Sequence, residues 1–174
     1  NMLANEMFLD SASLRSSIVS HAKTLGYVPS SARAAKATVD VTLNTNDSTA
    51  TMPAGTVFNT TVDDTTFQFS TIEAFTKSNT GNSIPFVGVD IFEGTFITTR
   101  YTVDTSDIDQ RFLLTDNRAD TSTLIVKVQT SSTDSTSTTF TEATDITQVT
   151  AGSNVFFLQE VEAGLFEVYF GDGV

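Results

Sequence analysis

Few side chains in this chain could act as general bases or nucleophiles, and His21 is the only histidine among its 174 residues. Any Ser-His-Asp triad or histidine-bound metal would therefore have to use His21. It falls near the end of a segment with helical periodicity, where His21 and Lys23 suit the negative end of the helix dipole. We predict a structural role for His21 and no catalytic residue.

Carboxylates are more numerous, and the stretch DTSDIDQ from Asp104 to Gln110 gathers three of them. Oxygen donors at this density can bind calcium, but the stretch lacks the glycine and the terminal glutamate of an EF-hand loop. A solvated acidic loop is therefore preferred over a calcium site. The aspartates concerned are Asp104, Asp107 and Asp109, with Asp116 and Asp120 farther along.

Other site types find little support in the residue pattern. Gly171-Asp172-Gly173 lacks the lysine and the hydroxyl residue of a phosphate-binding loop, so it predicts a turn. Cysteine is absent, which excludes disulfides, thiolate metal sites and cysteine nucleophiles. A glycosidase pair could arise by chance among so many Asp and Glu residues, but the sequence places no two of them in one cleft. We expect no enzyme activity, no cofactor and no metal.

An amphipathic helix is predicted from about Ser11 to Leu25. Asp10 or Ser11 can cap its first turn, and Gly26 followed by Pro29 ends it. At 100° per residue one face is apolar and should pack on the rest of the chain, while the opposite face is rich in small hydroxyl residues. The apolar face contains Leu14, Ile18, Ala22 and Leu25, with Val19 at its margin.

The hydroxyl face could permit close approach by another helix, or simply meet water. Arg15 lies on the otherwise apolar arc, so it either forms an ion pair between elements or subunits or extends to solvent, and we prefer the solvent interpretation. The candidate partner contacts are Ser13, Arg15, Ser16, Ser20 and Thr24.

After Ala37 the period changes to two, with Val39, Val41 and Leu43 alternating with polar residues, as in a half-buried strand. Serine and threonine make up 49 of 174 residues, and threonine favours strands. We predict an α+β, mainly β fold: an N-terminal amphipathic helix followed by antiparallel β-rich units. Further strands are expected near 57–58, 67–70, 72–76, 87–92, 95–103, 124–130, 155–160 and 166–170, with a low-complexity loop at 131–139.

Three segments are expected: a docking helix and linker at 1–34, a first β-rich unit at 35–104 and a second at 105–174. The formal net charge is −12, and residues 35–174 alone carry −13, without any cluster of Lys and Arg. Nucleic acid is therefore a disfavoured partner. No run of about 18 apolar residues and no signal-peptide pattern is visible, so no membrane association is expected.

The stretch NEMFLDSASLRSSIVSHAKTLGYVPSSARA, from Asn5 to Ala34, resembles a segment of the baseplate wedge proteins of T-even-like contractile-tailed phages, within the baseplate J-like family. MPAGTVF from Met52 to Phe58 and FGDGV from Phe170 to Val174 extend the resemblance in order along the chain. Family members are longer, so the resemblance implies that these 174 residues are a fragment.

This resemblance implies a structural component of the baseplate wedge that acts through subunit packing. The expected partners are a second copy of the chain and other wedge proteins, in the tail baseplate of a virion assembled in the host cytoplasm. The alternative is a glycan-binding β-sandwich adhesin of a tail or cell surface, with or without calcium at the aspartate cluster. Aromatic platforms in a shallow groove would favour that alternative.

Overall fold

A computed structural model describes residues 2–107, 110–145, 147, 149–161 and 164–171. The chain divides into two compact units, of which one is Ala34–Thr99 and the other combines Asn1–Arg33 with Arg100–Val174. We call them the inserted unit and the host unit. This division differs from the three successive segments expected from the sequence, because residues 1–33 belong with the C-terminal strands rather than standing apart.

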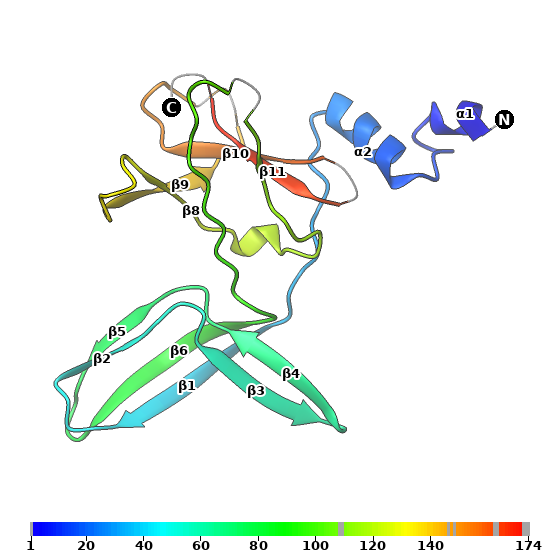
Figure 1. Cartoon of the computed structure of the whole chain (residues 1–174). Helices are drawn as coiled ribbons and strands as arrows, with labels where there is room; N and C mark the ends of the chain where they lie inside the picture. The colour runs from blue at the N-terminus through cyan, green and yellow to red at the C-terminus, as the bar shows by residue number, and fades with distance from the viewer. Residues whose placement is uncertain (1, 108–109, 146, 148, 162–163, 172–174) are drawn as a thin grey trace. The chain divides into compact units, whose positions relative to one another are not determined.

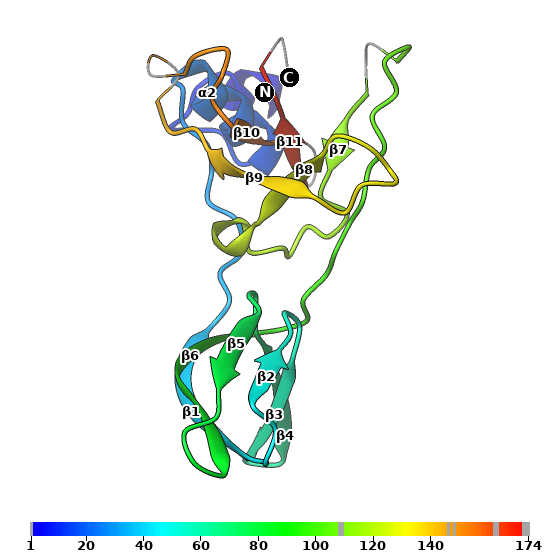
Figure 2. The same cartoon turned by 90° about the vertical axis from the view of Figure 1, so that its left-hand side faces the viewer.

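The inserted unit contains six strands, and four of them form one antiparallel sheet in the order β1-β6-β4-β3. β2 and β5 pair separately, side by side in Figure 2. The bounds are β1 Lys36–Asn44, β2 Thr49–Met52, β3 Val57–Val62, β4 Thr65–Ser70, β5 Phe75–Ser78 and β6 Ser83–Glu93.

The period of two in β1 is confirmed as far as Val41: Ala37, Val39 and Val41 pack against the core, whereas Leu43, predicted on the same row, is 45% exposed. β1 pairs with β6 along its length, with a shift of register between Val39 and Val41. At this bulge Gly88 has a φ of +70°, and its N–H donates to the Asp40 carboxylate at 2.7 Å. The bulge bends the long ribbon around its core.

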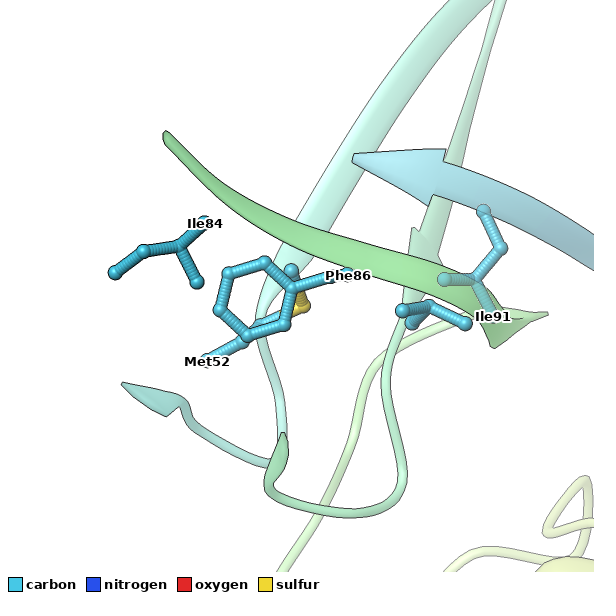
Figure 3. Packing of buried hydrophobic residues seen from close by; sticks show 5 residues of the cluster. Met52, Ile84, Phe86 and Ile91 are labelled. Atoms are coloured by element: carbon cyan, nitrogen blue, oxygen red, sulfur yellow. The ribbon is translucent and has the colours of Figure 1, made fainter. Parts of the chain in front are cut away.

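The core of the inserted unit lies between β2 and one face of β6. Ile84 has no exposed surface and Phe86 is 3% exposed. Figure 3 shows Met52 beside these two side chains, with Ile91 farther along β6. The five buried members are Met52, Ile84, Phe86, Val89 and Ile91.

The two ends of the inserted unit meet, because the Glu93 N–H donates to the Ala35 carbonyl at 2.8 Å beside the Lys36–Phe92 pair. A chain that leaves and returns at neighbouring points can be inserted into another unit without disturbing it. This explains why residues 1–33 and 100–174 can share one unit although 66 residues separate them.

The host unit holds both helices and a five-stranded sheet in the order β7-β11-β10-β9-β8. The β9–β10 pair is parallel and short, whereas the other pairs are antiparallel. Along β10 the buried Phe156, Leu158 and Glu160 alternate with half-buried residues. The bounds are α1 Met2–Glu6, α2 Arg15–Thr24, β7 Phe112–Leu113, the 3-10 turn η1 Thr121–Thr123, β8 Val126–Gln129, β9 Ser137–Glu142, β10 Val155–Glu160 and β11 Phe166–Tyr169.

The α+β, mainly β class is confirmed, but the strand predicted at 95–103 is wrong. The side chains there make other contacts: Phe96 lies 3.4 Å from the position of a Cβ on Gly55, and the Tyr101 hydroxyl donates to the Leu113 carbonyl. β-branched and aromatic residues favour strands only where a neighbouring strand is present. This stretch contains the passage between the two units and has no such neighbour. The loop predicted at 131–139 is also too long, because β9 begins at Ser137.

Candidate functional site

The N-terminal helix is shorter than predicted, since α2 begins at Arg15 and Leu14 occupies its N-cap position without a side-chain cap. The predicted caps Asp10 and Ser11 are therefore wrong, and the Ser11 hydroxyl instead donates to the Asn5 carbonyl. Glu6, the last residue of α1, takes over the capping role. Its carboxylate accepts the Ser13 N–H at 3.0 Å and the Leu14 N–H at 3.2 Å.

Glu6 thereby joins α1 to the start of α2. Hydrogen bonds from Ser17 and Ser13 lower the pKa of Glu6 to about 2, so this carboxylate remains ionised down to acidic pH. His21 completes the junction, because its Nε2 lies 2.9 Å from the Glu6 carbonyl. This contact links α2 to α1 within the chain, so His21 has a structural role at the junction of the two helices.

The C-terminus of α2 forms a Schellman motif. The Gly26 N–H donates to the Lys23 carbonyl and the Tyr27 N–H to the Ala22 carbonyl, each at 2.9 Å. Gly26 has a φ of +74°, as its predicted position after the helix requires.

Replacing Gly26 by alanine should therefore destabilise the host unit by about 1 kcal/mol, because an L-residue is strained in this conformation. An added Cβ meets no atom within 4 Å, so the cost is confined to the backbone. Urea denaturation measures it. Gly152→Ala is the matched control, since its Cβ also meets nothing and its φ lies outside the left-handed region. Equal midpoints for the two variants would contradict the role of Gly26.

Arg15 fixes α2 to the sheet. Its Nε and Nη2 atoms donate to the two carboxylate oxygens of Glu160 on β10, both at 2.7 Å. The Glu160 side chain is only 2% exposed, whereas that of Arg15 is 59% exposed. The solvent interpretation of Arg15 is therefore wrong, because a buried carboxylate requires a counter-charge and Arg15 supplies it.

The same geometry recurs on the next strand. Arg111 donates through two nitrogens to the carboxylate of Glu167 on β11, at 2.9 and 2.8 Å, and thereby lowers the pKa of Glu167. Neither glutamate was predicted from the sequence. One signal was available for Glu160: it continues the buried alternation of Phe156 and Leu158, and a carboxylate on that side of a strand needs a cation.

The helix buries only part of the face predicted. Val19 is 5% exposed and Ala22 is 9% exposed, on the same side as Arg15. Leu14, Ile18 and Leu25, which were expected in the core, are 44%, 39% and 75% exposed. Counted from Leu14 at 100° per residue, Arg15, Val19 and Ala22 lie at roughly 80–140° and the three exposed residues at about 0–40°, so the buried side is the one that carries the Arg15–Glu160 pair. We call Leu14, Ile18 and Leu25 the apolar strip.

The other candidate contact residues lie in two different places, one at the junction of the helices and three on the exposed face of α2. The Ser13 hydroxyl donates to the Glu6 carboxylate at 2.8 Å, so Ser13 serves the helix junction. Ser16, Ser20 and Thr24 are exposed, and the Thr24 hydroxyl donates to the Ser20 carbonyl within the helix. The predicted hydroxyl face thus exists, but Arg15 and Ser13 are engaged within the chain.

The aspartates of the acidic stretch mostly cap turns. Asp104 accepts from the N–H and hydroxyl of Ser106, and Asp120 accepts from the N–H of Ser122. Asp116 pairs with Arg118. Asp109 lies outside the described residues, as do Asp172 and Gly173 of the predicted terminal turn. Among the residues that the structure describes, no group of three or more acidic, histidine or cysteine side chains is placed to hold a metal ion.

Two neighbouring hollows of about 180 and 310 Å³ occur in the host unit. Both are lined by Thr121, Ser122 and Glu142, and most of their other wall residues are apolar. The aromatic residues of the larger hollow, Phe140 and Phe156, are 7% and 3% exposed and belong to the core. They form its floor and offer no exposed aromatic platform of the kind that would favour a glycan-binding role.

Within the described residues, no helix is both long enough and apolar enough to cross a bilayer. The chain matches no family model and no curated protein.

Proposed function

We propose that this chain is a structural component of the baseplate wedge of a contractile phage tail and acts through subunit–subunit packing. The proposal rests on the resemblance of residues 5–34 and 52–58 to wedge proteins, and on the apolar strip of α2 as the packing surface. Its partners would be a second copy of the chain and other wedge proteins, in a virion assembled in the host cytoplasm. It assigns no catalysis and no cofactor to the chain.

The apolar strip is the main structural support for this proposal, because the residues on both sides of it already contact other parts of the chain. On one side Arg15, Val19 and Ala22 meet the rest of the host unit, and on the other side Ser17 and His21 meet α1 through Glu6. The strip between them is apolar and exposed. An apolar row with fixed borders can receive an apolar face of another helix at little entropic cost.

The surroundings of the strip are also rich in exposed apolar residues. Of the 17 large hydrophobic residues exposed in the described chain, eight fall within residues 7–28. Exposed apolar surface at this density is characteristic of interaction sites. Residues 1–33 carry three cations and two carboxylates, so this part lacks the acidic excess of the remaining chain and can approach another acidic subunit. The eight residues are Met7, Phe8, Leu9, Leu14, Ile18, Leu25, Tyr27 and Val28.

Two double variants test the proposal, and each adds two carboxylates four residues apart on α2. Leu14→Glu with Ile18→Glu alters the apolar strip, whereas Ser16→Glu with Ser20→Glu alters the hydroxyl face. All four positions are exposed, so both variants should fold. We expect the strip variant to lose association with co-expressed wedge proteins of the same phage, because charges would be buried in an apolar contact.

Association is measured by size-exclusion chromatography with light scattering, and folding by circular dichroism. Loss of binding only in the serine variant would move the contact to the hydroxyl face predicted from the sequence. A folded strip variant that assembles normally with every wedge partner would refute the proposed surface.

A further inference from the structure

We propose that β3 of the inserted unit is a pairing edge for the β3 strand of a second copy, so that two chains join their sheets antiparallel about a two-fold axis. This inference concerns a different surface from the apolar strip and holds whichever way α2 docks.

β3 is an edge strand with its outer side unpaired by any strand of the described chain. It pairs only with β4, from Val57 opposite Ser70 to Val62 opposite Thr65. Figure 1 shows the two strands extending to a free tip at the turn of residues 63–64. Five of the six residues of β3 are exposed, and Phe58 alone packs against the core.

The turn fixes which backbone groups face outward. Asp63 and Asp64 have φ values of +47° and +61°, as a two-residue type I′ turn requires. The residues that flank such a turn, Val62 and Thr65, exchange hydrogen bonds with each other. Because hydrogen-bonded and non-bonded pairs alternate, Phe58, Thr60 and Val62 bond toward β4. The N–H and C=O groups of Val57, Asn59 and Thr61 therefore point to the open side.

This edge lacks the usual protection against strand pairing. Natural edge strands carry lysine, proline or a bulge that discourages another strand from adding. Three of the other edge strands carry a lysine, Lys36 in β1, Lys77 in β5 and Lys127 in β8, whereas the short β2 and β7 carry none. β3, with the sequence VFNTTV, has none of these features and consists mostly of residues that favour strands.

A second copy fits the edge in a defined register. Outward residues must oppose outward residues, so a two-fold axis at Asn59 places Asn59 opposite its equivalent and Val57 opposite Thr61 of the other chain. The strand itself is uncharged, and the acidic turns lie at opposite ends of the pair. At about 3.3 Å per residue the two Asp63 residues are then roughly 26 Å apart, well beyond the screening length at physiological salt.

A single cysteine tests this register, since the chain has no cysteine of its own. Opposite residues of a hydrogen-bonded antiparallel pair have Cα atoms about 5.5 Å apart, within the range of a disulfide. Under mild oxidation the full chain with Asn59→Cys should form a covalent dimer. Thr66→Cys is the matched control: Thr66 is exposed on β4, which pairs with the inner side of β3, so this variant should form no covalent dimer.

Asn59→Lys is the complementary variant, because it places two lysines directly opposite each other. Sedimentation of the full chain should show dimerisation weakened roughly tenfold or more, while Thr66→Lys leaves it unchanged. Equal cross-linking of the two cysteine variants, or dimerisation that Asn59→Lys does not alter, would overturn the proposal. Association that responds only to the variants of the apolar strip would likewise exclude β3 and leave the proposed function intact.

Discussion

Replacing Arg15 by methionine is expected to destabilise the host unit by about 3 kcal/mol. The variant leaves the carboxylate of Glu160 buried without its counter-charge, and breaking one side of a buried pair is strongly destabilising. We expect the lower end of the usual range because the Arg15 side chain is 59% exposed, so water can replace part of the lost contact. Urea denaturation followed by tyrosine fluorescence measures the loss.

Two further variants isolate the cause. Arg15→Met combined with Glu160→Met should recover most of the lost stability, since no buried charge remains and both side chains are apolar. Arg118→Met should change little, because the partner of Arg118, Asp116, is partly exposed and this pair lies in solvent. If the double variant is less stable than the single one, packing rather than charge accounts for the role of Arg15.

The second large effect is expected for Phe86→Ala in the inserted unit. Phe86 is 3% exposed and packs beside Met52 and Ile84, so truncation leaves a cavity and should cost roughly 3–5 kcal/mol. A unit of 66 residues has a total stability of roughly 3–10 kcal/mol. The variant should therefore lose most of the structure of the inserted unit at moderate denaturant concentration. Val87→Ala, at a neighbouring position that is 70% exposed, serves as the control.

The positions of the tyrosines allow the two units to be followed separately. The chain has no tryptophan, and all three of its tyrosines, Tyr27, Tyr101 and Tyr169, belong to the host unit. Phe86→Ala should shift part of the circular dichroism transition while the tyrosine transition stays in place. Arg15→Met should shift the tyrosine transition. If Phe86→Ala shifts both signals equally, the two units unfold as one.

Local patterns predicted much of the fold. The alternation in β1, the long apolar run of β6 and the turn at Gly26 follow from strand and helix periods and from the conformational freedom of glycine, which act over a few residues. The prediction of strands fails where the interaction that decides the structure is distant in sequence. Residues 95–103 have strand-like composition but no partner strand, and β9 forms inside a stretch that reads as loop because β8 and β10 lie beside it.

At the candidate site, the residue pattern alone predicts a helix with an apolar row before a β-rich body and places Arg15 within that row. Which face of the helix is buried depends on contacts that are distant in sequence. That choice depends on Glu160, which lies 145 residues away along the chain and becomes a neighbour of Arg15 only because the inserted unit returns to its starting point. Arg15 bonds both oxygens of this buried carboxylate, and a buried carboxylate left without its cation is strongly destabilising. The helix therefore turns toward Glu160 and leaves Leu14, Ile18 and Leu25 exposed.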